Sequence, residues 1–410
     1  MKKLLLIFVL AIASLLPVTV IGLQTNTVAM ATDTANFDAT VAGNNADANA
    51  NNMVFTARSA YLTDYETGLV MFEKNAEEKF PIASMVKIMV LNLTFEAIDA
   101  GKLSFSQKVT VSPEAQKMGG SQLFIEAGDE YTVSDLIKGV VICSANDAAA
   151  ALGETISGSI EGFVSTMNAR AREYGMANTV FINATGLPGA GQHSTAHDVN
   201  IMTRKLLAHK EYYNYSKIYM ENYKHPDGRV TELVNTNKLV RFFNGCDSGK
   251  TGYTADAKYC LSASAMRNNL RVVATVIGVD DSKTRFAEVT KLFNYGFSNY
   301  QSEKLVTAGQ VVTKDFAVTN GKAKTVPVIA KGSVSVLSKK GSKPTFTTEV
   351  NLPANVRAPF NANTTLGELI VRGVNGEVLG RTELITANDV QKRTYGDAIN
   401  DILGNWILGK

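Results

Sequence analysis

The chain has 410 residues, of which 45% are hydrophobic and 19% are charged. This length exceeds what one hydrophobic core usually fills, so we expect two domains. Ordinary numbers of Gly and Pro, three Cys and one long apolar run exclude collagen-like, disulfide-scaffold and polytopic membrane proteins. A net charge of +3 does not predict the basic surface that binds nucleic acid, so no nucleic-acid partner is expected.

The first 31 residues have the pattern of a signal peptide. Two lysines precede an apolar run over 4–23, and Ala29-Met30-Ala31 offers a small-x-small cleavage site. An uncleaved anchor is the alternative, because the run is nearly long enough to span a bilayer. Either way, we expect the rest of the chain to lie outside the cytoplasmic membrane. Residues 32–52 have no apolar period, which predicts a flexible leader.

Residues 53–300 mix strand and helix patterns, which predicts an α/β catalytic domain with one all-helical part. A sheet is expected from an early hairpin and late strands. The predicted strands are 54–62, 69–72, 259–266 and 271–279, and the predicted helices are 84–97, 132–142, 160–174, 196–207 and 284–293. A Gly-rich loop is expected over 183–194.

The remaining chain predicts a small all-β domain over 301–387, followed by an amphipathic helix over 388–410. Short β-branched runs alternate with turn residues in the first segment. From Tyr395 onward, apolar residues recur at helical spacing. Residues 395–410 fit either a membrane interface or docking on their own domain, since the polar face is acidic where interfacial helices tend to be rich in Lys.

Three cysteines in an oxidising compartment leave room for one disulfide. Cys246 and Cys260 flank a predicted strand and turn, and whether they pair is open at this point. Cys143 ends an apolar run and is expected to be a buried core residue. No catalytic cysteine is expected.

Three short motifs follow one another along the chain. They are Ser84-Met85-Val86-Lys87, Ser144-Ala145-Asn146 and Lys250-Thr251-Gly252. Each is a weak signal alone, but their order and contexts together favour a serine acyl-transfer site.

The first motif supplies a nucleophile and a base. Residues three apart on a helix share a face, so the Lys87 amine reaches the Ser84 hydroxyl. Lysine acts as a base where burial and a second cation lower its pKa, and the apolar helix and Lys250 would supply both effects. The helix N-terminus also directs backbone N–H groups toward developing negative charge. The alternative is an N-capping Ser84 with a solvated Lys87.

The other two motifs supply groups that relay a proton and bind substrate. Ser144 and Asn146 are expected on a short loop, where the hydroxyl passes a proton and the amide holds a peptide. Lys250 would fix a negative charge, Thr251 would add a hydrogen bond, and Gly252 would let a substrate backbone approach. A simple hairpin turn is the alternative for this motif.

Metal and cofactor chemistry is not indicated. His193 and His197 lie four apart, but no H-E-x-x-H motif accompanies them, so loop or capping roles are expected and no metal site is predicted. The G-x-S-x-G elbow of other serine hydrolases is absent.

The ordered motifs resemble those of the low-molecular-weight penicillin-binding proteins that act as D-alanyl-D-alanine carboxypeptidases. The resemblance covers roughly residues 54–300, and the all-β tail is similar to the second domain common in that family. It is also carried by Gly120-Ser121, Gly186-Leu187-Pro188, Ser194-Thr195-Ala196-His197-Asp198 and Tyr295-Gly296-Phe297.

The resemblance implies a role for each motif residue. Ser84 would be the acylated nucleophile and Lys87 its base. Ser144, Asn146 and Lys250 would complete the proton relay and substrate clamp. The backbone N–H groups of Ser84 and Tyr253 would form the oxyanion hole, and Arg285 would help to receive the terminal carboxylate.

The resemblance also implies the substrate and partners. The expected enzyme removes the terminal D-alanine from peptidoglycan stem pentapeptides ending in D-Ala-D-Ala, is trapped by β-lactam antibiotics, needs no cofactor and is anchored to the membrane by its C-terminal helix. A serine β-lactamase is disfavoured because of the extra β-domain and because the loop after Asn183 lacks a deacylating Glu. A non-catalytic cell-wall-binding protein would have no use for the intact Ser84–Lys87 pair.

Overall fold

The computed structural model describes residues 53–342, 345–397 and 399. The predicted signal peptide and leader (1–52), and residues 400–410 of the predicted terminal helix, lie outside the described residues. Within the described part of the chain, no helix combines the length and apolar character that crossing a membrane requires.

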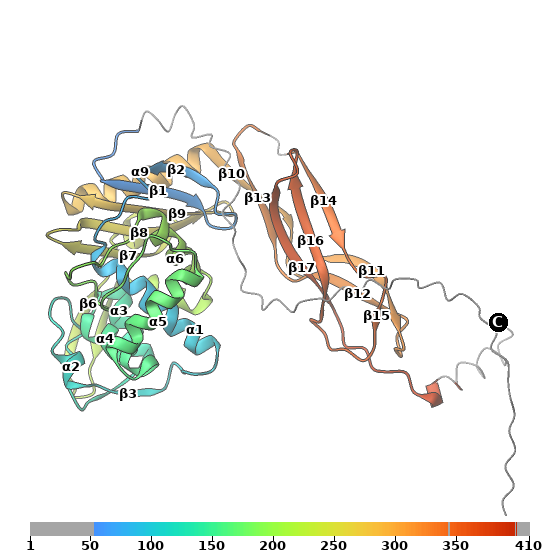
Figure 1. Ribbon diagram of the computed structural model, residues 1–410, viewed down its shortest axis with the longest axis horizontal. Coiled ribbons are helices and arrows are strands. Elements are labelled where there is room, and N and C mark those ends of the chain that lie inside the picture. Colours follow the sequence, from blue (N-terminus) through green and yellow to red (C-terminus); the bar gives the residue numbers. More distant parts are fainter. Residues whose placement is uncertain (1–52, 343–344, 398, 400–410) are drawn as a thin grey trace, which may run out of the picture. The chain divides into compact units, whose positions relative to one another are not determined.

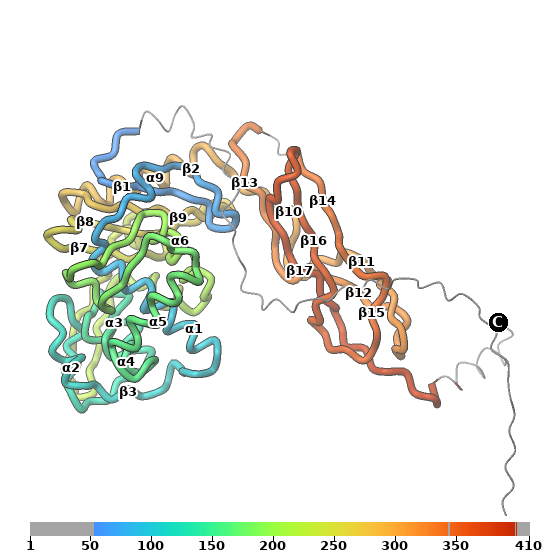
Figure 2. Tube along the Cα trace, in the orientation of Figure 1, coloured from blue at the N-terminus to red at the C-terminus, as the bar shows by residue number. Residues whose placement is uncertain are grey.

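The N-terminal domain (residues 53–299) is built on one antiparallel sheet with strand order β2-β1-β9-β8-β7. The strands are β1 (Ser59–Asp64), β2 (Val70–Lys74), β7 (Cys246–Thr254), β8 (Lys258–Arg267) and β9 (Leu270–Val279). Strand β1 pairs with β9, with Tyr61 opposite Thr275, so segments far apart in sequence lie side by side (Figure 2). The sheet of an early hairpin and late strands is confirmed, and β7 forms one edge of it.

Helices cover both faces of this sheet (Figure 1). Helix α9 (Ser282–Asn299) packs on one face, with Leu62, Val272 and Ala274 in the shared core. Tyr61, Val273 and Ile277 alternate with those residues and face the larger helical core. This alternation follows from the two-residue period of a strand. The α/β class predicted from the sequence is confirmed.

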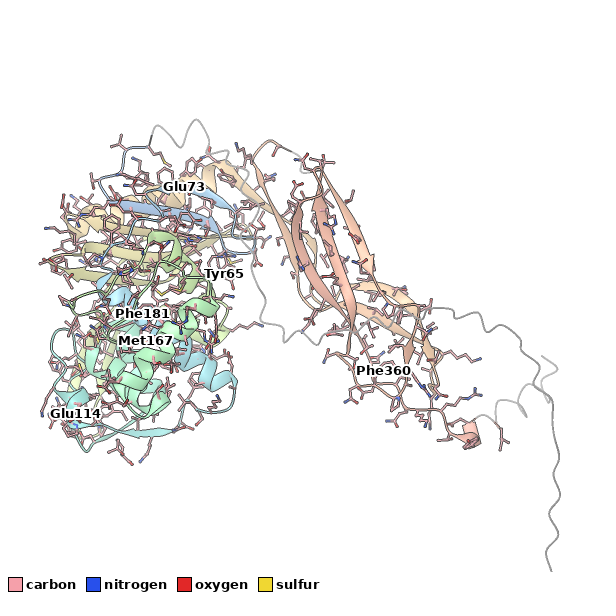
Figure 3. All side chains as sticks on the ribbon, in the orientation of Figure 1. Tyr65, Glu73, Glu114, Met167, Phe181 and Phe360 are labelled. Carbon is pink, nitrogen blue, oxygen red and sulfur yellow. The ribbon has the colours of Figure 1, made fainter. Side chains whose placement is uncertain are left out.

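The larger helical core contains the predicted all-helical part. Its main helices are α1 (Lys87–Asp99), α3 (Val133–Ile142), α4 (Asn146–Ser157), α5 (Ile160–Glu173) and α6 (Ala196–Leu207). A Thr132–Asp135 capping box begins α3, and the Thr195 side chain caps α6. Met167 and Phe181 lie inside this part (Figure 3).

Shorter elements connect these helices and strands. They are η1 (Ala83–Val86), α2 (Pro113–Gln116), η2 (Lys210–Tyr212), α7 (Tyr213–Ser216), α8 (Leu239–Phe242) and the hairpins β3 (Lys108–Thr110) with β4 (Glu130–Thr132) and β5 (Met220–Lys224) with β6 (Val230–Val234).

The C-terminal domain (residues 300–392, the β-domain) contains only strands among its described residues. Strand β10 (Tyr300–Val306) pairs with β13 (Val334–Lys339), and a six-stranded sheet has the order β14-β16-β17-β12-β11-β15. Its strands are β11 (Val311–Thr319), β12 (Thr325–Ala330), β14 (Phe346–Asn351), β15 (Val356–Arg357), β16 (Thr365–Gly373) and β17 (Val378–Thr386). Val326, Val328, Val371 and Leu384 fill its core.

Three expectations need correction. Val390 and Lys392 form bridges to Phe360 and Gly321, and residues 388–394 are not helical, so the predicted terminal helix does not begin at 388. Of its described residues, 395–397 and 399 are helical. The buried helix predicted from Ser84 begins at Lys87, because Ala83–Val86 form a tighter 3₁₀ turn. Cys143 is half-buried at the end of α3 instead of lying in the core.

The cysteines are all free. The β7–β8 register places Cys246 opposite Ala265 and Cys260 opposite Gly252. At about 3.3 Å per residue, the two thiols therefore belong to positions too far apart along the hairpin for the Cα separation of a disulfide. The pairing left open by the sequence does not form.

Candidate active site

The Ser84–Lys87 turn lies at the start of the buried helix α1. Ser84 belongs to the η1 turn, and Lys87 is the first residue of α1. The Lys87 side chain is 0% exposed, with Nζ 3.0 Å from Ser84 Oγ and 2.7 Å from the backbone oxygen of Thr185. The alternative of a solvated Lys87 is therefore wrong, and the amine lies within hydrogen-bond reach of the hydroxyl.

The electrostatic surroundings favour a neutral Lys87. Burial lowers the pKa of its amine well below the usual lysine value, and the positive charge of Lys250 lowers that pKa further. Removing an ammonium from water is costly without a carboxylate partner, so the uncharged amine is the favoured form. A neutral amine beside a hydroxyl is a competent proton acceptor.

A second hydroxyl–lysine pair joins the other two motifs. Lys250 is 2% exposed, and its Nζ donates to Ser144 Oγ at 2.7 Å and to the Thr251 carbonyl at 3.0 Å. Burial lowers the pKa of Lys250 to about 7, and the charge of Arg285 acts in the same direction. Ser144 adopts the left-handed conformation at φ 64°, which is uncommon for a non-glycine residue and concentrates at functional sites.

Asn146 opens helix α4, where the sequence predicted a loop. Its side-chain Nδ2 donates to the Gly119 carbonyl and its backbone N–H donates to the Ser121 carbonyl at 2.7 Å. The buried Oδ1 has no hydrogen-bond partner among the described residues. A buried amide oxygen left open in this way is available to a peptide N–H donor from outside the chain.

Asp147 is a site residue that the sequence reasoning missed. Its fully buried carboxylate accepts backbone N–H groups from Leu123 at 2.9 Å, Phe124 at 2.8 Å and Ile125 at 3.2 Å. These bonds hold the 119–125 loop against the start of α4 and thereby position Asn146. The available signal was an acidic residue in the first turn of an Ala-rich segment, which is typical of a helix N-terminus.

Two glycines seat the Ser84 turn. A Cβ on Gly186 would lie 2.0 Å from the Ala83 carbonyl oxygen, and one on Gly252 would lie 2.6 Å from the Ile82 carbonyl oxygen. Gly186 also has φ +81°, a conformation that favours glycine. The close approach at Gly252 was expected for a substrate, but in the structure the turn that carries Ser84 makes it.

The remaining predicted residues lie along β7 and behind it. Thr251 is buried within the strand, whereas Tyr253 is 56% exposed and its ring packs at a tilt against Tyr259, with ring centroids 4.4 Å apart. Arg285 on α9 is 6% exposed and donates from Nη1 to the Gly252 carbonyl at 3.4 Å and the Cys260 carbonyl at 3.3 Å. Its guanidinium therefore links strand β7, which carries the Lys250-Thr251-Gly252 motif, to the neighbouring strand β8.

The two histidines of the 193–197 segment have structural contacts. His193 Nδ1 lies 2.8 Å from the Gly191 carbonyl, and His197 Nδ1 lies 2.9 Å from Glu77 Oε1. The ligand atoms of Glu77, His197 and Asp198 lie within 4.8 Å of one another. The buried Asp198 carboxylate already accepts from Thr179 Oγ1 at 2.7 Å, so hydrogen bonds within the fold account for this cluster.

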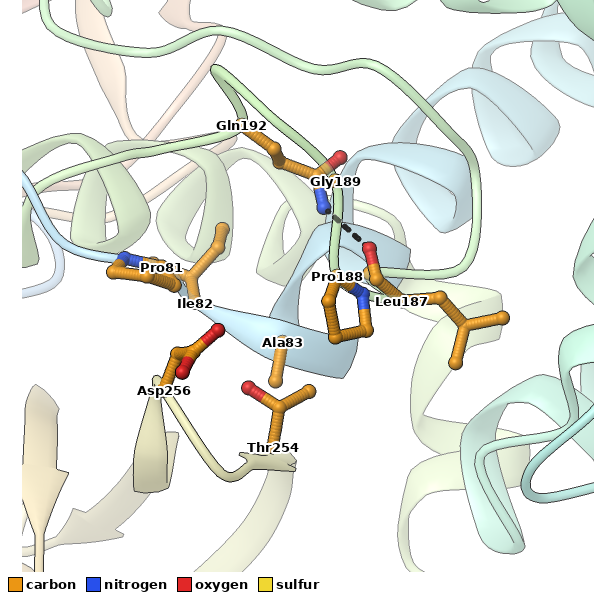
Figure 4. Close-up of a pocket in the computed structure, with 10 residues that line it drawn as sticks. Pro81, Ile82, Ala83, Leu187, Pro188, Gly189, Gln192, Thr254 and Asp256 are labelled. Atoms are coloured by element: carbon orange, nitrogen blue, oxygen red, sulfur yellow. Dashed lines mark hydrogen bonds between the residues drawn. The ribbon is translucent and has the colours of Figure 1, made fainter.

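A small pocket lies beside the serine turn (Figure 4). One wall comes from residues 81–83, immediately before Ser84, and another from the 186–192 loop. Thr254 and Asp256, just past the Lys250-Thr251-Gly252 motif, complete it. The segments next to the Ser84 and Lys250 motifs therefore border the same pocket.

Two family models match the chain. Residues 45–281 match the model of the peptidase S11 family, described as D-alanyl-D-alanine carboxypeptidase. Residues 300–392 match the model of the penicillin-binding protein 5 C-terminal domain.

Individual relatives agree with these matches. The D-alanyl-D-alanine carboxypeptidase DacF of Bacillus subtilis is 40% identical over 351 residues, covering 85% of this chain and 90% of that protein. The solved penicillin-binding protein 5 of Haemophilus influenzae has a TM-score of 0.64 at 28% identity, covering 83% of this chain and 99% of that one. Penicillin-binding protein D2 of Listeria monocytogenes, solved in its ampicillin-bound form, has a TM-score of 0.54 at 31% identity, covering 60% and 99%.

Proposed function

The chain belongs to the peptidase S11 family of D-alanyl-D-alanine carboxypeptidases, and on that premise we propose that Ser84 is its nucleophile and Lys87 the base. It is a serine-type, penicillin-binding hydrolase that acts in cell-wall metabolism. The contact between the buried Lys87 amine and Ser84 Oγ at 3.0 Å is the observation that carries the assignment.

Acylation begins with attack of Ser84 Oγ on the carbonyl carbon of the penultimate D-alanine, while the hydroxyl proton passes to Lys87 Nζ. The backbone N–H groups of Ser84 and Tyr253 receive the negative charge that develops on the carbonyl oxygen. The peptide C–N bond then breaks. The Ser144 hydroxyl donates a proton to the departing amine of the terminal D-alanine. The proton that Lys87 took from Ser84 then restores the Ser144 hydroxyl, which leaves Lys87 neutral again.

Deacylation uses the Lys87–Ser84 part of this proton route in reverse. A water molecule gives a proton to Lys87 and attacks the ester carbonyl, and Ser84 leaves with its proton restored. The products are the shortened stem peptide, with a new carboxyl terminus, and free D-alanine.

Three groups on or beside β7 support the substrate clamp. The protonated Lys250 would bind the terminal carboxylate, with Thr251 adding a hydrogen bond and Arg285 adding positive charge from behind the strand. The open Oδ1 of Asn146 would accept a backbone N–H of the substrate. Because β7 is an edge strand, a peptide can lie along it in extended form.

Labelled penicillin tests the assignment of Ser84. A β-lactam carbonyl should acylate the same hydroxyl, so wild-type protein should retain the label and Ser84→Ala should not. Ser104→Ala, which removes a hydroxyl from an exposed position, is the matched control and should label normally. Retention of label at full stoichiometry in Ser84→Ala would falsify the assignment.

Mass spectrometry of a D-Ala-D-Ala peptide tests the reaction. Wild-type protein should remove a single alanine, and the Ser84→Ala variant should leave the peptide intact. Rapid turnover of penicillin without release of D-alanine would instead identify a β-lactamase.

We further propose that the protein acts on the outer side of the cytoplasmic membrane. The Lys2-Lys3 start, the apolar run and Ala29-Met30-Ala31 support export, and peptidoglycan lies outside that membrane. Sequencing the N-terminus of the protein from cells should find Thr32. A start at Met1 would indicate an uncleaved anchor.

The amphipathic pattern of residues 395–410 supports contact with the outer face of the cytoplasmic membrane. Co-sedimentation of the mature protein with anionic lipid vesicles should fall when residues 395–410 are deleted. Equal sedimentation of both forms would exclude this contact.

A further inference from the structure

The pocket beside Ser84 carries a single charged side chain. Of the ten residues that line it, Asp256 alone is ionisable at neutral pH, while Pro81, Ile82, Leu187 and Pro188 supply apolar surface (Figure 4). An apolar wall with one acidic group matches a long aliphatic side chain that ends in an ammonium group.

Hydrogen bonds within the fold leave Asp256 as the group available to a ligand. The Gln192 amide is tied into its own loop, with Oε1 accepting from Ile182 N at 3.2 Å and Asn183 N at 3.3 Å. Thr254 Oγ1 accepts from Ala257 N at 3.1 Å. The exposed Asp256 carboxylate has no hydrogen-bond or ion-pair partner among the described residues. The neighbouring Arg58 side chain donates to the Asp256 backbone oxygen, at 3.3 Å, and not to the carboxylate.

The direction of β7 relates this pocket to the substrate. Gly252 lies beside the Ser84 turn, Lys250 lies two residues before it, and Asp256 lies four residues after it in the turn that follows β7. An extended peptide with its carboxylate at Lys250 and its scissile carbonyl at Ser84 continues toward Thr254 and Asp256 at about 3.3 Å per residue. The residue before D-Ala-D-Ala therefore reaches the pocket.

We infer that this pocket receives the side chain of the residue preceding D-Ala-D-Ala, and that Asp256 selects a side chain ending in an ammonium group. The inference rests on the proposed function, since it takes Ser84 and Lys250 as fixing the position of the peptide. Asp256 is a specificity-determining residue in this scheme and takes no part in the proton transfers.

Two peptides that differ only in charge test the inference. They carry lysine or Nε-acetyl-lysine before D-Ala-D-Ala. Wild-type protein should cleave the lysine peptide with a kcat/KM about five- to tenfold higher, between the effects of a surface ion pair and of a charged hydrogen bond. Asp256→Asn should remove the preference by slowing only the lysine peptide. Asp315→Asn, an exposed change in the β-domain, should keep it.

Charge reversal gives an independent readout. Asp256→Lys should favour an Nε-succinyl-lysine peptide, whose side chain ends in a carboxylate, over the lysine peptide. Penicillin labelling of each variant reports whether Ser84 remains competent.

The possible failures are distinguishable. Equal cleavage of the lysine and acetyl-lysine peptides by wild-type protein would overturn the role of Asp256 and leave the carboxypeptidase intact. Absence of D-alanine release from every peptide, with no penicillin labelling, would overturn the proposed function itself.

Discussion

The two domains treat charged side chains in opposite ways. Among the described residues, every buried charged side chain lies in the N-terminal domain, including Lys87, Asp147, Lys250 and Arg285. Charges of the β-domain stay at the surface, as in the Lys331–Glu383 pair, whose side chains are 57% and 34% exposed. Burying a charge is costly, so each such group needs hydrogen-bond partners or a shift of its pKa toward the neutral form.

The two buried lysines also differ from lysines that form ordinary ion pairs. In the described chain, neither Lys87 nor Lys250 contacts a carboxylate; each contacts a serine hydroxyl and a backbone carbonyl. A carboxylate partner would hold the lysine protonated, whereas these neutral oxygen atoms let burial lower its pKa. Burial of these two amines thus costs folding stability in the N-terminal domain and lowers their pKa values.

Lys87→Met breaks this arrangement most severely. Loss of the base should slow acylation by labelled penicillin by about 10²- to 10⁴-fold, the usual contribution of a positioned general base. Methionine keeps a similar length and apolar stem, so the fold should persist. Stopped-flow or quench measurement of the acylation rate checks the change, and a rate within threefold of wild type would exclude Lys87 as the base.

The Lys87→Met variant also tests how burial of this amine affects the free energy of unfolding. The folded-state pKa of Lys87 is lowered, so the unfolded chain binds a proton that the folded chain does not, over the pH range between the two pKa values. Over that range the wild-type unfolding free energy should fall as the pH falls, and the variant should lack this contribution. Urea titrations between pH 9 and pH 7 should therefore show the variant gaining stability relative to wild type as pH falls. A constant difference would contradict a depressed pKa.

Lys250→Arg tests whether the second lysine must be protonated. With a pKa of about 7 in the free enzyme, the Lys250 ammonium is lost above neutral pH, so kcat/KM for a D-Ala-D-Ala peptide should decline about tenfold per pH unit on the alkaline side. Arginine stays charged there, so the variant should keep its own, lower kcat/KM nearly constant from pH 7 to pH 9. An identical alkaline decline in both proteins would assign it to another group.

Gly186→Ala probes the seat of the Ser84 turn. The new Cβ would collide with the Ala83 carbonyl, and overpacking of this kind costs about 1–3 kcal/mol. We expect a lower midpoint in urea and slower penicillin acylation. Gly101→Ala, at a φ of +69° but with nothing within 4 Å of the added atom, separates the backbone strain from the collision.

Lys331→Ala in the β-domain should have the smallest effect. Exposed ion pairs contribute about 0–1 kcal/mol, so the free energy of unfolding should change by no more than that. Penicillin acylation and peptide cleavage should match wild type. A loss of activity would show that the β-domain influences the site, contrary to the division of roles described above.

The fold was predictable where local patterns were strong. The apolar run of α1, the alternation of β9 and the hairpin β1–β2 all specify their elements within short windows. The β5–β6 hairpin was missed because its mixed polar and apolar residues, such as Glu221 and Asn222, follow no clear period. Helix α4 was missed although Ala148–Ala151 favour a helix, since the motif at 144–146 was interpreted as a loop.

The site was predictable to a different extent for each contact. The spacing of Ser84 and Lys87 within one turn follows from helix geometry. The contact of Lys250 with Ser144 joins residues 106 positions apart, and no local pattern places these two side chains in contact. The Thr185 carbonyl, 98 residues from Lys87, and the loop held by Asp147 depend on tertiary packing that no local pattern encodes.

The Ser84 turn packs against the backbone of both Gly186 and Gly252, and this packing determines how much substrate binding energy is needed to position Ser84. Backbone on both sides fixes the nucleophile before any peptide arrives, so binding energy is not consumed in arranging it. Contacts distant from the scissile bond, such as the one inferred for Asp256, are then free to discriminate between substrates. A preorganised centre therefore leaves the choice between substrates to residues at the edge of the site.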